Sequence, residues 1–219
     1  MNLEILREIG IINTLRFNWK YFKWGMIKPK VICSRNVILD KLDGKVKISN
    51  PAIGGIKIGF GHVGIIDGKR EKTIWQNCGT IRFVSHVRLD IGTRIVCSMD
   101  GVLSIGEDVQ ITGRSSVICY KEISIGNNCL ISWDNLLMDT DFHKIYLLTD
   151  VCKKKINNND RILIGNHVWI GCRCMVLKGA TIPDNSVISA GSIITRKHDT
   201  PNALYVGNKV NKNSIGWEA

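Results

Sequence analysis

The 219 residues include 44% hydrophobic and 22% charged side chains, enough apolar material for one sizeable core. The formal net charge of +11 predicts attraction to coenzyme phosphates, an anionic glycan, a lipid phosphate or a membrane surface. Nucleic acid is excluded because no helix-turn-helix, zinc-finger or RNA-binding signature accompanies the charge. The sequence shows neither a run of roughly 18 apolar residues that would span a membrane nor a secretory signal, so we expect one main cytoplasmic domain.

Residues 1–30 form the first predicted element, a flanking segment without a repeat. Apolar side chains at Ile5, Leu6, Ile9, Ile12 and Leu15 predict an amphipathic helix that caps or flanks the domain. Aromatic side chains then interleave with basic ones, at Phe17, Trp19, Tyr21, Phe22 and Trp24. This pattern fits a peripheral membrane contact and fits packing against a neighbouring subunit equally well.

Residues 31–200 carry a six-residue spacing of aliphatic side chains. It is strict near the C-terminus, at Ile164, Ile170, Val176, Ile182, Ile188 and Ile194. It runs earlier in two phases, at Val87, Thr93, Met99, Ile105, Ile111, Val117 and Ile123, and at Ile125, Ile131 and Leu137. Residues six apart do not lie on one face of a helix, so the spacing does not indicate a helix. Three short strands and three turns per coil would instead build a triangular solenoid with stacked aliphatic side chains inside. A β-sandwich with coincidental spacing is the weaker alternative.

Small residues recur at fixed places in this repeat. Ile-Gly pairs mark predicted corners at Ile58-Gly59, Ile91-Gly92, Ile105-Gly106, Ile125-Gly126, Ile164-Gly165 and Ile170-Gly171. A small side chain also follows four residues after an aliphatic one, at Cys78, Cys129, Cys174 and Ser186. We therefore interpret the eight cysteines as reduced, packed thiols. Cys172 and Cys174 lack nearby partner ligands, so no metal is predicted.

The repeat stops between Leu137 and Ile162, and we predict an inserted loop at residues 138–161. The segment is polar and charged, and it places His143 between acidic and basic residues. Long loops in compact repeat proteins are disordered or functional, which makes this loop the first place to look for chemistry. Residues 201–219 form a C-terminal tail.

Two segments, ISWDNLLMDTDFHKI (residues 131–145) and ILIGNHVWIGCRCMVLKGATIPDNSVISAGSIITR (residues 162–196), resemble hexapeptide-repeat acetyltransferases. The resemblance is to the subgroup that O-acetylates capsular polysaccharide and lipopolysaccharide sugars. It implies an all-β, left-handed parallel β-helix and a homotrimer with active sites between subunits. It also implies transfer of acetyl from acetyl-CoA to a sugar hydroxyl of a bacterial surface polysaccharide or its precursor.

The same resemblance implies roles for individual residues. His143 matches the general base, and an imidazole titrates near the neutral pH that proton removal from a hydroxyl requires. Asp139 and Asp141 are the candidate partners that would orient the ring, and Asp141 is favoured. Because acetyl-CoA is already activated, no cysteine is needed as a nucleophile.

The predicted coenzyme site consists of residues matched by motif and of small or basic neighbours. Its members are Trp169, Cys172, Gly179, Ala180, Ala190, Thr195, Arg196 and Lys197. Trp133 and Asp134 are predicted to contact the acceptor. The stretch Gly207–Asn211 departs from the Gly-Asn-Pro-Ala-Lys of the family, which predicts altered binding at the adenine end of the coenzyme.

Three alternatives stay open. Within the acyltransferases, the acceptor would be the amine of an amino sugar, or serine. A solenoid carbonic anhydrase would need three histidines on one zinc, and the five histidines lie tens of residues apart. A noncatalytic scaffold would predict that neither His143 nor Trp169 takes part in chemistry.

Overall fold

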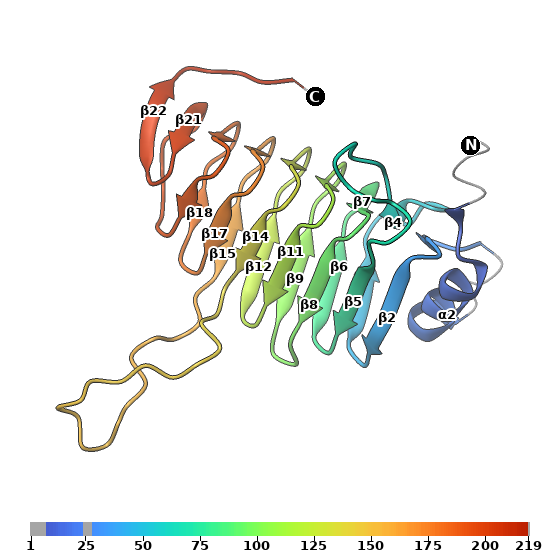
Figure 1. Cartoon of the computed structure of the whole chain (residues 1–219), viewed down its shortest axis with the longest axis horizontal. Helices are drawn as coiled ribbons and strands as arrows, with labels where there is room; N and C mark the ends of the chain where they lie inside the picture. The colour runs from blue at the N-terminus through green and yellow to red at the C-terminus, as the bar shows by residue number, and fades with distance from the viewer. Residues whose placement is uncertain (1–7, 24–27, 219) are drawn as a thin grey trace.

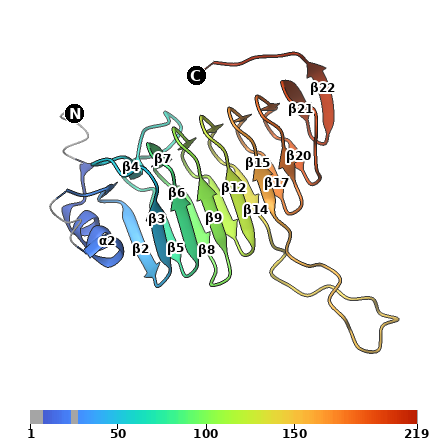
Figure 2. The same ribbon diagram turned by 180° about the vertical axis from the view of Figure 1, so that it is seen from behind.

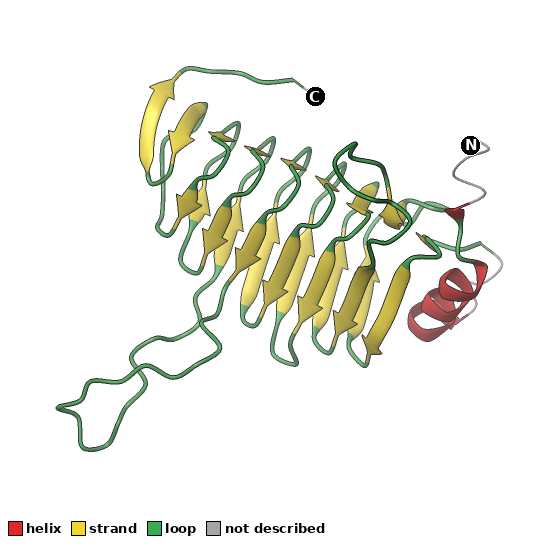
Figure 3. Ribbon diagram, in the orientation of Figure 1, coloured by secondary structure: helices red, strands yellow, loops and turns green. Residues whose placement is uncertain are grey.

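A computed structural model describes residues 8–23 and 28–218. Its strands form three sheets that wind around one axis, as Figures 1 and 3 show, and all pairs of strands are parallel except the antiparallel last pair, β21 and β22. The nine-stranded sheet contains β1 (Val31–Cys33), β4 (Ile56–Phe60), β7 (Val87–Asp90), β10 (Gln110–Ile111), β13 (Leu130–Ile131), β16 (Trp169–Ile170), β19 (Val187–Ile188), β21 (Ala203–Val206) and β22 (Lys209–Asn213). The predicted left-handed parallel β-helix is confirmed.

The other two sheets complete each triangular coil. The seven-stranded sheet contains β2 (Val37–Leu42), β5 (Thr73–Asn77), β8 (Arg94–Cys97), β11 (Ser116–Cys119), β14 (Leu136–Met138), β17 (Met175–Leu177) and β20 (Ile193–Ile194). The six-stranded sheet contains β3 (Lys45–Ile48), β6 (Thr80–Phe83), β9 (Val102–Ile105), β12 (Glu122–Ile125), β15 (Ile162–Ile164) and β18 (Thr181–Ile182). We call the turn from the nine- to the seven-stranded sheet the first corner, the turn from the seven- to the six-stranded sheet the second, and the return to the nine-stranded sheet the third.

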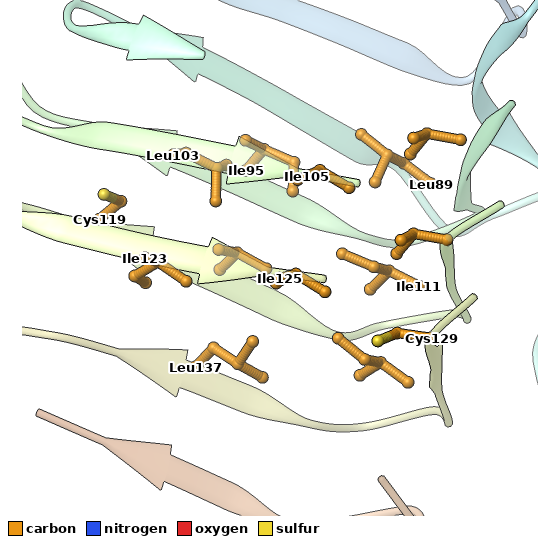
Figure 4. Packing of buried hydrophobic residues seen from close by; sticks show 14 of the residues in the cluster. Leu89, Ile95, Leu103, Ile105, Ile111, Cys119, Ile123, Ile125, Cys129 and Leu137 are labelled. Carbon is orange, nitrogen blue, oxygen red and sulfur yellow. The ribbon is translucent and has the colours of Figure 1, made fainter. Parts of the chain in front are cut away.

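The core lies inside the triangle, where aliphatic side chains of successive coils stack in rows (Figure 4). All six positions of the strict C-terminal repeat, from Ile164 to Ile194, are buried. Met99 is the exception among the earlier positions, since 81% of it is exposed. It lies in the turn between β8 and β9, where Cys97 occupies the inward position instead. The cysteines Cys129 and Cys174 are buried as predicted, whereas Cys78 is only half-buried.

The glycines of the third corner are required by packing distance. A Cβ on Gly126 would lie 2.4 Å from the carbonyl oxygen of Gly165 in the next coil, and one on Gly106 would lie 2.6 Å from Gly126. The left-handed backbone conformation at this corner is adopted by other residues, such as Asp108 and Asn128. Asn and Asp tolerate that conformation better than most side chains. The Ile-Gly pairs here therefore mark close approach between coils.

The helix α2 (Ile11–Phe22) closes the N-terminal end of the solenoid. Its buried face is Thr14, Phe17 and Asn18, so the predicted apolar face at Ile12 and Leu15 is wrong, and both are exposed. The predicted positions Ile5, Leu6 and Trp24 lie outside the described residues.

The buried face of α2 is partly polar because it meets the open edge of β1. Asn18 donates to the carbonyl of Val31 (2.6 Å) and accepts from its amide (3.3 Å). The Thr14 hydroxyl donates to the Cys33 carbonyl (3.2 Å) and accepts from its amide (3.0 Å). These bonds satisfy an edge strand that would otherwise offer unpaired backbone groups. Within residues 8–23 and 28–218, no helix combines the length and apolar character that a membrane span requires.

Candidate active site

The inserted loop leaves the solenoid at the second corner, between β14 and β15, and projects away from the coils (Figures 1 and 2). Stacking continues across it, because β15 pairs with β12 in the register Ile123 to Ile162. The insertion therefore does not disturb the repeat. His143 lies exposed near the start of this loop.

The base of the loop is held by Asn157, a buried side chain that the sequence analysis did not single out. Its amide donates to the carboxylate of Asp141 (2.8 Å) and to the carbonyl of His143 (2.8 Å), and its oxygen accepts from the Ile145 amide (2.7 Å). Asn157 is the first of three consecutive asparagines, and nothing in the sequence distinguishes it from the other two. Asn157 therefore holds the backbone at His143 and Ile145 and the side chain of Asp141.

Among the described residues, the Asp141 carboxylate makes no hydrogen bond to the His143 ring, so its predicted role in orienting that ring stays a prediction. Its carboxylate accepts from the Lys178 ammonium and from Asn157. The Lys178 hydrogen bond, followed by the bond from Asn157, lowers the pKa of Asp141. The carboxylate is therefore held ionised, but its partners come from the loop base and the neighbouring coil.

Asp139, the other candidate partner of His143, is bonded to backbone amides in this structure. It is fully buried, and its carboxylate accepts the backbone amides of Tyr120 (2.7 Å), Lys121 (2.8 Å) and Glu122 (2.8 Å). These amides form the second corner of the preceding coil. Among the described residues, no side chain hydrogen-bonds the His143 imidazole.

Trp169 lies on β16 in the outer face of the nine-stranded sheet and is 38% exposed. Its indole N–H donates to the Ser132 hydroxyl (3.1 Å). The C-terminal segment returns across this face and places the Trp217 ring 6.0 Å from that of Trp169. Trp217 also stacks on His167 at 4.4 Å with an interplanar angle of 9° and donates to its carbonyl (2.9 Å). The sequence analysis missed Trp217, because nothing in a non-repeating tail indicates where it returns.

The first corner carries Trp133, Asp134, Cys172 and Ala190 on successive coils. Asp134 makes a bidentate pair with Arg114 (2.8 and 2.7 Å) and lies 3.8 Å from Arg173. Its backbone is left-handed, with φ of 59°. Asp134 therefore joins three coils, and its predicted contact with the acceptor stays a prediction. Trp133 beside it is half-buried.

The second corner carries Gly179, Thr195, Arg196 and Lys197 close to the loop base. Asn208 holds two of them: it bonds the Thr195 amide (3.0 Å) and hydroxyl (2.8 Å), and its carbonyl accepts from Arg196 (2.8 Å). Ala180 is fully buried in the core, so its side chain cannot line a coenzyme groove as predicted.

The outer face of the seven-stranded sheet lies between these two corners and is apolar in its C-terminal half. Two rows of side chains form this patch, Leu136, Met175 and Ile193 in one, Ile118, Met138 and Leu177 in the other. Met175 and Ile193 are 44% and 48% exposed. The predicted residues therefore border one apolar surface from both sides, with the His143 loop at one edge.

Three further observations concern residues outside this surface. A cavity of about 800 Å³ under residues 61–72 is lined by His62, Ile66 and Lys69, and contains none of the predicted site residues. In the part of the chain that the structure describes, no group of three His, Cys, Asp or Glu side chains could hold a metal ion. Burial raises the pKa of the Cys129 thiol to about 11, which makes it a poor nucleophile.

Residues 161–196 match the family described as "Bacterial transferase hexapeptide (six repeats)". This match marks residues 161–196 as a segment similar to hexapeptide transferases. It is 33% identical over 105 residues to the galactoside O-acetyltransferase of Escherichia coli K12, covering 48% of this chain and 50% of that protein. It is 34% identical over 88 residues to the polysialic acid O-acetyltransferase of Neisseria meningitidis, covering 39% of this chain and 40% of the other. The chain thus matches about half the length of these relatives.

A solved structure shares the fold of coiled parallel strands over most of the chain. The N-acyltransferase AntD of Bacillus cereus, in complex with dTDP and coenzyme A, superposes with a TM-score of 0.53. The match covers 85% of this chain and 81% of AntD at 17% identity. This likeness establishes the architecture of the coils.

Proposed function

We propose that this protein transfers an acetyl group from acetyl-CoA to a sugar hydroxyl of a bacterial surface polysaccharide or its precursor. The observation that carries the proposal is the exposed His143. Its loop is held at the base by Asn157 and directly precedes the matched hexapeptide segment 161–196. The relatives named as sugar O-acetyltransferases support the acceptor class. An amine acceptor, as in AntD, is the alternative within the same chemistry.

The reaction needs one proton acceptor and no covalent enzyme intermediate. The sugar oxygen attacks the thioester carbonyl while the His143 imidazole takes the hydroxyl proton. The C–S bond then breaks, and the proton passes to the departing thiolate, which leaves as coenzyme A. Trp169 borders the acyl end of the donor, and Arg196 and Lys197 attract its phosphates.

The site is completed by a second copy of the chain in a homotrimer. The imidazole of His143 has no orienting partner among the described residues, and the apolar patch of the seven-stranded sheet has no cover there. A subunit packed on this patch would enclose the coenzyme between two solenoids and exclude water from the thioester.

The test is acceptor-dependent release of coenzyme A thiol with a panel of surface-glycan sugars and their amino counterparts. His143→Ala should lower kcat by about 100-fold or more, which is the usual contribution of a general base. His86→Ala is the matched control, since His86 is an exposed histidine at the third corner of another coil. Equal loss in both variants, or calorimetry that shows no coenzyme A binding, would overturn the proposal and favour the scaffold.

A further inference from the structure

The outward face of α2 is apolar although the helix already buries its opposite face. Ile11, Ile12, Leu15 and Trp19 lie on this face, and they range from 39% to 81% exposed. The buried Thr14, Phe17 and Asn18 occupy the other side, and Thr14 and Asn18 hydrogen-bond β1. The exposed stripe is therefore not needed to hold the helix in place.

The charge around this stripe is positive. The helix Ile11–Phe22 contains Arg16 and Lys20 and no acidic residue, and Lys23 follows it directly. Residues 8–45 contain eight Lys and Arg but only three Asp and Glu, which are Glu8, Asp40 and Asp43. Asp40 and Asp43 line a small hollow against Arg16 and Lys20, beside the helix. On the helix itself and at its end, Arg16, Lys20 and Lys23 are the charged residues beside the apolar stripe.

The helix α2 lies at one end of the molecule, so its outward face can contact a flat surface such as a membrane. Figures 1 and 2 place α2 at the N-terminal end of the solenoid, outermost along its long axis, and the His143 loop near the other end. An apolar stripe that includes a tryptophan and is flanked by Arg and Lys is the pattern of a helix that lies in the membrane interface.

We propose that α2 docks the protein on an anionic lipid membrane, with Ile12 and Trp19 inserted among the headgroups and Arg16 and Lys20 against lipid phosphates. Binding of this kind adds the burial of apolar side chains to electrostatic attraction. It does not depend on the proposed acetyl transfer, and it would bring the enzyme to acceptors carried on lipid.

The experiment is co-sedimentation of the full chain with vesicles of phosphatidylcholine alone and with about 30% phosphatidylglycerol. The protein should pellet with the anionic vesicles only and should dissociate as NaCl rises from about 0.1 to about 0.5 M. Ile12→Ser with Trp19→Ser should weaken binding by about tenfold or more. Ile53→Ser with Met99→Ser is the matched control, because Ile53 and Met99 are equally exposed apolar residues elsewhere.

Three outcomes would overturn the proposal. One is equal binding by the helix variant and the control. Another is loss of binding only in Leu148→Ser with Val151→Ser, which would assign the contact to the exposed tip of the inserted loop. The third is a smaller oligomer for the helix variant in lipid-free sedimentation, which would mean that a second copy covers α2. Unchanged acetyl transfer to a soluble sugar in the helix variant separates this test from that of the proposed function.

Discussion

Asp139 and Asp141 lie two residues apart at the start of one loop, and their carboxylates meet different surroundings. Asp139 points into the solenoid and accepts three backbone amides, whereas Asp141 pairs with Lys178 and Asn157 at the rim. The alternation of side chains in an extended segment puts residues i and i+2 on one side, so the difference arises where the chain leaves β14. The Asp-x-Asp pattern could not show which carboxylate faces inward.

The role of Asp139 predicts a loss of stability on its removal. Asp139→Ala leaves three amides of the second corner without acceptors in a buried site, which should cost about 3 kcal/mol or more in unfolding free energy. Denaturant titration measures this loss. Asp160→Ala removes an exposed pair with Lys121 and should cost less than about 1 kcal/mol. A comparable small change in both variants would show that the Asp139 bonds are dispensable.

The pairing of Asp141 predicts a pH dependence. Its folded pKa is lowered below the unfolded value of about 3.9, so the pair stabilises the loop base above that pH. This contribution is lost as the pH falls through the folded pKa. A carbon-detected NMR titration of Asp141 should show the low pKa, and Lys178→Met should raise it. Lys155→Met, which removes a weaker and more distant charge, should raise it much less.

At the scale of elements, the strands of the solenoid follow from the sequence far better than the helix does. The six-residue spacing predicts the inward rows because each aliphatic position stacks on its equivalent in the next coil. The exception at Met99 arises from a turn of different length, which spacing alone does not detect. The face of α2 could not be predicted from hydrophobic periodicity, because the helix buries polar Thr14 and Asn18 against the backbone of β1.

The capping role of α2 predicts that Phe17 is essential for stability. Its ring is fully buried and packs edge-on against Trp75 at 5.1 Å. Phe17→Ala should therefore lower the unfolding free energy by about 3 to 5 kcal/mol, the usual cost of a large cavity. Leu15→Ala, on the outward face of the same helix, should change it by less than about 1 kcal/mol. Chemical denaturation of the two variants decides whether the helix is part of the folding unit.

At the scale of the whole molecule, the sequence placed the candidate residues on the correct fold without showing how they meet. Trp169, Cys172 and Arg196 match a family motif, but their arrangement depends on where each lies: Trp169 on β16, Cys172 at the first corner and Arg196 at the second. Trp217 enters that arrangement only because the C-terminal segment returns along the nine-stranded sheet. Contacts made by a non-repeating tail leave no periodic signal.

The proposed trimer gives a prediction for the intact protein. Sedimentation equilibrium should give three times the chain mass of 24.5 kDa. Met175→Lys places a charge in the apolar patch and should shift the mass toward the monomer, since a buried unpaired charge opposes association. Ile53→Lys, at an exposed site outside the patch, should leave the trimer intact. A wild-type monomer would contradict the trimer.

The uninterrupted pairing of β12 with β15 has a consequence for how such proteins diversify. The coils on both sides of residues 139–161 remain in register whatever that segment contains, and the entropic cost of a loop rises by only about 0.6 kcal/mol for each doubling of its length. A lineage can therefore lengthen, shorten or exchange this segment in one genetic event and keep the stacked coils unchanged. Divergence in acceptor preference would then concentrate in one insertion, while the stacked coils change slowly around it.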